Sequence, residues 1–267
     1  MNARLALFLL LAGAGFVLAA GTDESGRAAF TDQETVSDNT FATASSFPAV
    51  AILDAWTTGT THSVSAGTDR LLVFVAGMEN GKQASSPPAG DRDLIAVSYG
   101  GESLTQASEA VVCSGSSNSF CGRTELWYLD EAGIQAATGS SFTPTWSGDP
   151  PFELEEYFAA VTLENVDQSA PIGDTSTSST TSSNPIQIAS ALSVVPGDYV
   201  IVSAFAGNGG SYTPDVDYTE STDQSLASST MATADKAITA AGSEQPSMQF
   251  DASINRQVIL AVAFNDS

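Results

Sequence analysis

Short runs in which apolar and polar residues alternate make up most of the chain, and this period of two is typical of β-strands with one buried face. The clearest examples are TELWYL at residues 124–129 and SMQF at residues 247–250. Two other runs, at residues 71–76 and 258–264, are apolar throughout, which favours central strands covered on both faces. Turn signals containing glycine and proline separate the runs. The predicted strands are residues 49–56, 61–65, 70–78, 94–99, 103–112, 123–129, 142–146, 157–164, 185–191, 199–206, 225–236, 248–252 and 257–264.

Many short strands at this spacing predict an all-β protein, with a single jelly-roll-like β-sandwich at residues 48–267. A helix of one or two turns is expected only at residues 131–138. The Ser/Thr-rich segment 174–184 is either a linker between two smaller domains or a long loop or edge strand of one domain. We favour one domain because each half alone has few strands and the final apolar run needs partners.

The first residues, MNARLALFLLLAGAGFVLAA, have the three parts of a secretory signal: a cation at Arg4, an apolar run and then small residues. We therefore predict a signal peptide at residues 1–29, with cleavage between residues 20 and 29, and an extracellular protein at the cell surface. A retained N-terminal anchor is the alternative. The apolar run is short for a membrane span and nothing later resembles one, so no stable span is expected in the mature protein.

The chain contains two cysteines, Cys113 and Cys121, which are separated by the segment SGSSNSF. This spacing can close a short loop between two strands, and an oxidising exterior allows the bond to form. A metal site is the weaker alternative, because no His or further Cys lies nearby. We predict a disulfide.

Acidic residues outnumber basic ones by 31 to 8, which gives a net charge of −23. Only 15% of the residues are charged and 42% are hydrophobic, so the composition predicts a packed core rather than a disordered acidic chain. Eight scattered cations cannot neutralise nucleic-acid phosphates, so no nucleic-acid partner is expected. The acidity indicates either a surface solvated in salty surroundings or carboxylates that bind calcium.

Calcium is the one cofactor that the sequence suggests. The stretch TPDVDYTESTD would supply several hard oxygen ligands from one loop. Its candidate ligands are Asp215, Asp217, Glu220 and Asp223. The stretch lacks the central Gly and the terminal Glu of an EF-hand loop. Asp91 and Asp93 form a second, smaller cluster.

Little in the sequence points to catalysis, and we predict that the protein is not an enzyme. His62 is the only His, it lies in a polar segment where a surface position is expected, and no Gly-x-Ser-x-Gly elbow accompanies it. The acids Glu153, Glu155 and Glu156 lie near Trp146, and a glycosidase needs two acids beside an aromatic residue. A charged loop is the simpler interpretation in so acidic a chain.

The segment AAFTDQETVSDNTFATA, at residues 28–44, resembles the start of mature proteins of the TasA/camelysin group. The matching positions are Phe30, Thr31, Asp32, Glu34, Thr35, Asn39, Thr40 and Phe41. The resemblance implies export through a dedicated signal peptidase, with cleavage just before Phe30. It also implies extracellular fibres, since such proteins form them and some relatives assemble by donating an N-terminal strand to the next subunit.

The rest of the chain is similar to a β-sandwich module of secreted and surface proteins of microbes. The motifs that carry this similarity are DRLLV at 69–73, VSYGGESLT at 97–105, ELWYL at 125–129, VDQSAPI at 166–172 and PGDYV at 196–200. They follow one another across most of the mature chain, which implies one sandwich domain. No reaction is attached to these motifs.

The leading hypothesis is a structural subunit of an extracellular filament, pilus or surface layer, in which the protein is its own partner in a homopolymer. Residues 30–47 would form an extended segment that leaves its own domain and completes an incomplete sheet of a neighbour. The side chains of this assembly strand would be Phe30, Phe41, Phe47, Val50 and Ile52. The simpler alternative is that residues 47–56 form the first strand of their own domain.

A module that binds a polysaccharide or another surface ligand is the alternative function. Four aromatic residues are candidate contacts if they are exposed: Trp56, Trp146, Tyr212 and Tyr218. Trp127 is expected in the core instead, because it alternates with Glu125 and Leu129.

Overall fold

The computed structural model describes residues 48–80, 93–114, 120–147 and 155–267. All of them belong to one compact unit, Ala44–Ser267. Several predictions lie outside the described residues: the signal peptide and its cleavage site, and the side chains of Phe30, Phe41, Phe47, Asp91 and Glu153.

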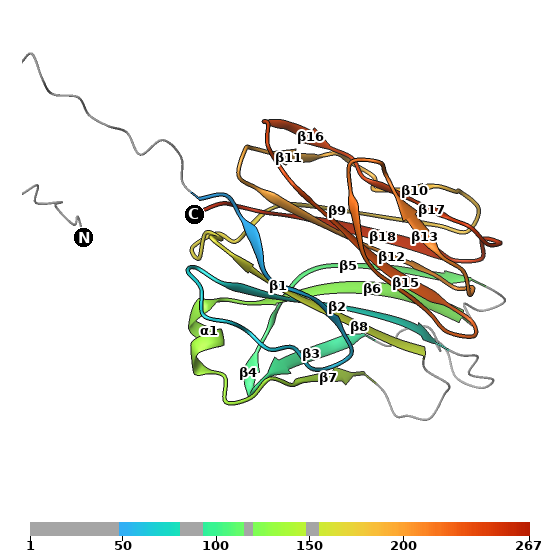
Figure 1. Ribbon diagram of the computed structural model, residues 1–267. Helices are drawn as coiled ribbons and strands as arrows, with labels where there is room; N and C mark the ends of the chain where they lie inside the picture. Colours follow the sequence, from blue (N-terminus) through green and yellow to red (C-terminus); the bar gives the residue numbers. More distant parts are fainter. Residues whose placement is uncertain (1–47, 81–92, 115–119, 148–154) are drawn as a thin grey trace, which may run out of the picture. The chain divides into compact units, whose positions relative to one another are not determined.

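Strands dominate the described part of the chain, so the prediction of an all-β fold is confirmed. Two five-stranded antiparallel sheets form the centre of the domain (Figure 1). The first sheet has the order β1 (Ala51–Thr58), β8 (Glu155–Glu164), β2 (Leu71–Asn80), β6 (Phe120–Leu129) and β5 (Thr105–Ser114). The second has the order β14 (Thr219–Ser225), β15 (Thr230–Ala237), β12 (Tyr199–Ala206), β18 (Gln257–Phe264) and β9 (Ile172–Thr180). The jelly-roll connectivity stays a prediction.

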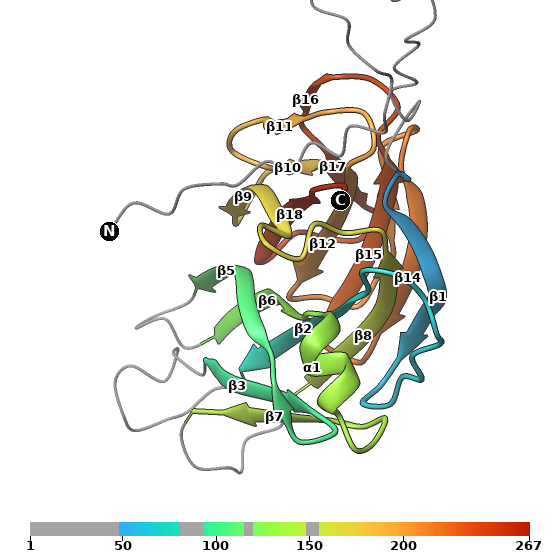
Figure 2. The same cartoon turned by 90° about the vertical axis from the view of Figure 1, so that its left-hand side faces the viewer.

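Smaller sheets cover the outer faces of the two large ones, so the strands lie in four layers (Figures 1 and 2). The first large sheet is covered by β4 (Glu102–Ser103), β3 (Leu94–Tyr99) and β7 (Phe142–Trp146). The second is covered by two small sheets: β10 (Ile186–Gln187), β17 (Ser247–Phe250) and β13 (Tyr212–Pro214), and the pair β11 (Leu192–Val194) and β16 (Gly242–Glu244).

Three hydrophobic clusters fill the spaces between the layers, and the central strands contribute to two clusters each. In β12, Ile201 and Phe205 face the other large sheet, whereas Val200 and Val202 face the small outer sheets. Successive residues of a strand point to opposite faces, so a strand between two cores has no position that faces water. The prediction that the fully apolar runs are central strands is confirmed.

Close packing of the two large sheets depends on a glycine in β6. A Cβ atom on Gly122 would lie 2.4 Å from Cε1 of Phe205, which belongs to the opposite sheet. A larger residue would displace that ring or separate the sheets, and protein interiors tolerate little added volume.

Most predicted strands are found, with differences at short or polar segments. Residues 61–65 make one isolated bridge, from Thr61 to Ser141, and no strand. The predicted strand 225–236 is instead the turn and second strand of the β14–β15 hairpin. The Ser/Thr-rich segment at 174–184 lies mostly in β9, an edge strand paired with β18. Its interpretation as an edge strand is confirmed.

The predicted short helix is α1 (Glu131–Ala136), which begins after the N-cap Asp130. The side chain of Asp130 accepts a hydrogen bond from Gly133 N at 2.8 Å, which satisfies one of the free N–H groups of the first turn. In that turn, the carboxylate of Glu131 accepts hydrogen bonds from Arg70 N at 2.9 Å and from Arg70 Nε at 2.8 Å. The helix is thereby fixed to the start of β2.

Strands β5 and β6 form a hairpin in which Cys113 and Cys121 lie directly opposite each other. A disulfide joins them, as the sequence predicts. The bond adjoins Ser114 and Phe120, the residues at the two strand ends, which line the cavity described below.

Candidate functional site

Two of the predicted assembly-strand residues lie in the described part of the chain. Val50 is 2% exposed and packs in the core between the large sheets, and its N–H donates to Gly197 O at 2.9 Å. Ile52 is 37% exposed and pairs with Leu163 of β8. Strand β1 is therefore the edge strand of its own sheet.

Of the four carboxylates predicted to bind calcium (Asp215, Asp217, Glu220 and Asp223), Asp215 and Asp223 have separate hydrogen-bond partners. Asp215 accepts hydrogen bonds from Ser247 N and Oγ at 2.7 and 2.8 Å, and Asp223 accepts one from Ser211 Oγ at 2.5 Å. The side chain of Asp217 is 73% exposed. Within the described residues, no group of three or more His, Cys, Asp or Glu side chains could hold a metal ion. Calcium stays a prediction of the sequence alone.

His62 is 3% exposed, so the expectation of a surface position is wrong. Its Nδ1 lies 2.8 Å from Thr57 Oγ1 and its Nε2 lies 2.9 Å from Thr162 Oγ1. The hydroxyl groups on either side allow a polar ring to be buried, which its polar sequence neighbours do not reveal. Burial lowers the pKa of His62, which favours the neutral ring. His62 thus links β1 to β8 as a structural residue.

The candidate aromatic contacts do not form an exposed platform for a polysaccharide. Tyr212 is fully buried and Tyr218 is 8% exposed. Trp56 and Trp146 are partly buried, each against a hydrophobic cluster. Trp127 is 7% exposed, and its predicted place in the core is confirmed.

Glu155 and Glu156 do not form the acid pair that a glycosidase needs. They are successive residues of β8, so their side chains point to opposite faces of the sheet. Glu155 instead accepts hydrogen bonds from Ser228 N at 3.0 Å and from Ser229 Oγ at 2.7 Å. It therefore holds the turn before β15 against the end of β8.

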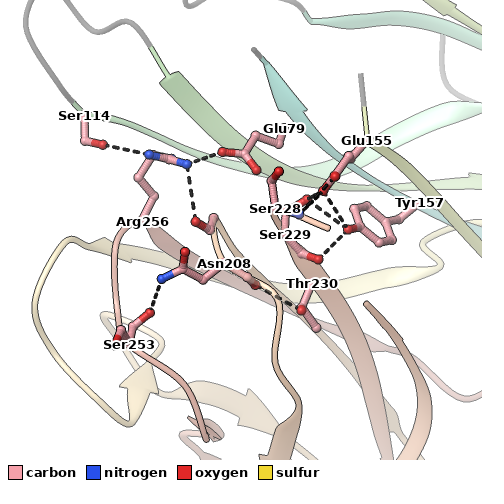
Figure 3. Close-up of polar contacts among 11 residues, drawn as sticks. Glu79, Ser114, Glu155, Tyr157, Asn208, Ser228, Ser229, Thr230, Ser253 and Arg256 are labelled. Atoms are coloured by element: carbon pink, nitrogen blue, oxygen red, sulfur yellow. Dashed lines mark hydrogen bonds and ion pairs between the residues drawn. The ribbon is translucent and has the colours of Figure 1, made fainter. Parts of the chain in front are cut away.

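A cavity of about 510 Å³, open to solvent and lined by both polar and apolar groups, lies beside this turn, where the ends of several strands meet (Figure 3). Strands of the first large sheet and loops next to strands of the second contribute residues to its wall. The principal lining residues are Glu79 of β2, Ser114 of β5, Phe120 of β6, Asn208 after β12, Ser228 before β15 and Arg256 before β18. The cavity therefore depends on both sheets and on the loops between their strands.

An ion pair between Glu79 and Arg256 forms part of this wall, and the side chains are only 7% and 4% exposed. Arg256 Nη1 also donates to Ser114 Oγ at 3.2 Å, and its guanidinium lies 5.1 Å from the centroid of the Phe120 ring. A Cβ atom on Gly207 would lie 2.4 Å from Arg256 Nη2. The guanidinium can occupy this position because residue 207 has no side chain.

Both members of the pair keep a buried polar atom without a hydrogen-bond partner, Glu79 Oε2 and Arg256 Nε. Such an atom costs about 1–3 kcal/mol, and native proteins contain few of them. Burial raises the pKa of Glu79, and the positive charge of Arg256 opposes this shift. A buried pair with unused hydrogen-bonding capacity is poor evidence for a purely stabilising role, and it marks a candidate binding site.

A second buried ion pair, Arg123 and Glu125 on β6, differs in the hydrogen bonds of its carboxylate. Arg123 Nη1 donates to Glu125 Oε1 at 2.9 Å, and the Glu125 side chain is 0% exposed. The same oxygen accepts from Leu94 N at 3.2 Å, while Oε2 accepts from Trp127 Nε1 at 3.1 Å and from Gln106 Nε2 at 2.9 Å. Both oxygens of Glu125 therefore accept hydrogen bonds, whereas Oε2 of Glu79 accepts none from the described residues.

The hydroxyl groups near the cavity are not arranged for nucleophilic attack. Ser229 is fully buried, and its Oγ lies within hydrogen-bond distance of both Glu155 and Tyr157 OH. Burial raises the pKa of Tyr157 to about 12, so its hydroxyl stays protonated and donates to Ser229 O at 2.6 Å. Both ring nitrogens of His62 are engaged by threonines, so that ring does not serve these serines as a base.

The sequence did not identify Glu79 and Arg256, because 177 positions separate them. One signal was present in the sequence. Arg256 is one of only 8 basic residues and stands directly before an apolar run, where a charge must be buried with a partner. The identity of that partner depends on the fold.

In the described part of the chain, no helix has the length and apolar character needed to cross a membrane. Comparison of the chain with protein-family models, with curated proteins and with solved structures finds no match in any of the three.

Proposed function

We propose that the protein is a secreted structural subunit of an extracellular filament, pilus or surface layer, and that residues 30–47 add to a neighbouring copy as a strand. The observation that carries the proposal is the position of β1. The chain enters its domain at the edge of a five-stranded sheet. A segment that precedes an edge strand can pair with another molecule without disturbing the core.

The contacts of β1 limit how much of the chain can be donated. Val50 packs in the core of its own domain, and Ile52 belongs to the β1–β8 pairing. Removing either from its place would expose apolar surface and break main-chain hydrogen bonds. We therefore restrict the donated segment to residues before Pro48, with Phe30, Phe41 and Phe47 as its apolar side chains.

The neighbouring copy also accepts the donated segment differently from the way expected from the sequence, in which the segment completes an unfinished sheet. Val73, Val161 and Leu260 pack between the large sheets and are 0% exposed, so the core is closed at these positions. The added strand therefore pairs with the edge of a sheet. The outer edges β5 and β14 contain none of the Lys or Pro residues that commonly block such pairing. Strand β9 is less open, because Ala189 N already donates to Thr177 O at 3.3 Å.

Deletion of residues 30–47, with the signal sequence kept, tests the proposal. Wild-type secreted protein should form fibres or sheets under the electron microscope, and the deletion variant should be secreted as a folded monomer. A full-length chain with Phe30, Phe41 and Phe47 changed to Ser should also stay monomeric. A matched chain with Thr31, Thr35 and Thr40 changed to Ser should assemble. Polymers from the deletion variant, or a wild-type protein that stays monomeric, would refute the proposal.

A further inference from the structure

We propose that the cavity at Glu79 and Arg256 binds a neutral, polyhydroxylated ligand of the saccharide class through its hydroxyl groups (Figure 3). The site is separate from the aromatic residues that the sequence suggested for polysaccharide binding. It is also independent of assembly through the N-terminal segment. Its volume, about 510 Å³, lies within the range of about 300–1,000 Å³ that is usual for small-ligand sites.

The charges around the cavity select against ions. Glu79 and Arg256 neutralise each other, and the nearby carboxylate of Glu155 leaves the surroundings negative in a chain with a net charge of −23. An anion is repelled by this field. A metal cation would compete with Arg256 for Glu79, and no group of three ligating side chains exists within the described residues. A neutral ligand avoids both costs.

The hydrogen-bonding groups select for hydroxyls. Glu79 has an unpartnered acceptor oxygen and Arg256 has an unpartnered N–H donor, and both residues line the cavity. A hydroxyl both donates and accepts, so two neighbouring hydroxyls can serve this ion pair after a small rotation of the Glu79 carboxylate. Ser228 and Asn208 add a hydroxyl and an amide to the wall. An apolar ligand would leave these groups unsatisfied.

The protein holds the Arg256 side chain in place before any ligand arrives. Arg256 lies over the Phe120 ring and donates to Ser114 Oγ. The neighbouring Cys113–Cys121 disulfide joins β5, which carries Ser114, to β6, which carries Phe120. The absence of a side chain at Gly207 leaves room for the guanidinium. Such preorganisation reduces the loss of side-chain freedom on binding. The position of Arg256 is therefore a property of the folded protein.

The probes are D-glucose, D-galactose and D-mannose, with maltotetraose and cellotetraose as oligomers, titrated into the full secreted protein by calorimetry and ligand-observed NMR. We expect a dissociation constant of about 1 mM for at least one neutral sugar. Equal affinity for monomer and tetramer indicates recognition of one sugar unit, and tighter binding of a tetramer indicates a polymer ligand. Glucuronate should bind at least about tenfold more weakly than glucose, because its carboxylate meets a negative field.

Two variants locate the site. Glu79→Gln should weaken binding by about tenfold, and Ala227→Trp, at an exposed rim position, should abolish it by filling the opening. The matched controls are Glu131→Gln, which alters a different Glu–Arg pair, and Ala240→Trp, at an exposed loop position that does not line this cavity. Thermal unfolding verifies that each variant folds. If Glu79→Gln does not fold, Ala227→Trp still tests the site. Absence of binding by every neutral sugar would overturn the proposal, as would unchanged binding by Ala227→Trp or glucuronate binding as tight as that of glucose.

Discussion

Trp56 Nε1 donates a hydrogen bond of 2.9 Å to Asp235 Oδ2, and this bond ties the edge strand β1 of one large sheet to β15 of the other. Asp235 is 7% exposed and also accepts a hydrogen bond from Tyr199 OH at 2.5 Å. A carboxylate this deeply buried is tolerated because donors surround it. The contact fixes β1 at the place where the N-terminal segment enters the domain.

Replacing Trp56 with Phe tests how much this bond contributes. The substitution keeps an aromatic ring but leaves Asp235 Oδ2 without its indole donor, so the free energy of unfolding should fall by about 1–3 kcal/mol. Urea unfolding followed by circular dichroism measures the change. Tyr128→Phe, in another partly buried ring that packs on the same core, should change it much less. An equal decrease in the free energy of unfolding in the two variants would show that the Trp56–Asp235 hydrogen bond makes no particular contribution to stability.

The Arg70–Glu131 pair makes the free energy of unfolding depend on pH in the acid range. Hydrogen bonds from Arg70 lower the pKa of Glu131 to about 2, from an ordinary value of 4.5. The folded state therefore holds this proton less tightly than the unfolded state, so the pair stabilises fully above about pH 4.5 and loses its contribution as the pH falls towards about 2.

Glu131→Gln should accordingly lower the free energy of unfolding at neutral pH, by about 1–2 kcal/mol after allowance for solvent screening of a pair near the surface. The difference between wild type and variant should disappear as the pH falls through the acid range. Chemical unfolding at a series of pH values measures it. A difference that stays constant down to about pH 2 would mean that the charge of Glu131 is not involved.

Titration of His62 affects the free energy of unfolding at a higher pH than titration of Glu131 does. Its pKa is lowered by burial from the ordinary value of 6.5, so the unfolded chain takes up a proton before the folded protein does. Stability should therefore be complete above about pH 6.5 and decrease as the pH falls below that value, until the folded-state pKa is reached. His62→Gln keeps a donor and an acceptor for Thr57 and Thr162 but cannot titrate. Its stability should stay flat over this interval, and a slope equal to that of wild type would exclude His62 as the cause.

The central strands could be predicted from the sequence because burial on both faces leaves an apolar run of matching length. Strand β18 lies at residues 257–264 as predicted, and β12 lies at residues 199–206. The short outer strands β11 and β16 were missed, since each has three residues and its pairing depends on contacts far away in the chain. Local pattern carries little information about such pairings.

The candidate site was harder to predict for the same physical reason. Cys113 and Cys121 could be paired from their spacing, because a hairpin brings nearby residues together. Glu79 and Arg256 meet only after the two sheets stack, so neither has a sequence neighbour that reveals its partner. The burial of His62 depends on Thr162, a residue of another strand. Contacts between residues close in the sequence can therefore be predicted, whereas contacts that form only when the strands and layers pack together cannot.

The charge of −23 leads to a prediction about the proposed polymer. Residues 1–29 contain two Arg and two acidic residues, so removal of the predicted signal peptide would leave the whole excess of negative charge on the rest of the chain. Stacked subunits repel one another, and the repulsion reaches about 30 Å at 0.01 M salt but only about 8 Å at 0.15 M. Fibres should therefore dissociate on dialysis into dilute buffer and form again when sodium chloride is restored, as followed by light scattering and electron microscopy. Dissociation by a chelator at constant ionic strength would instead show that bound divalent cations hold the subunits together. Fibres that survive both treatments would mean that strand pairing exceeds the repulsion, and the prediction would then be wrong.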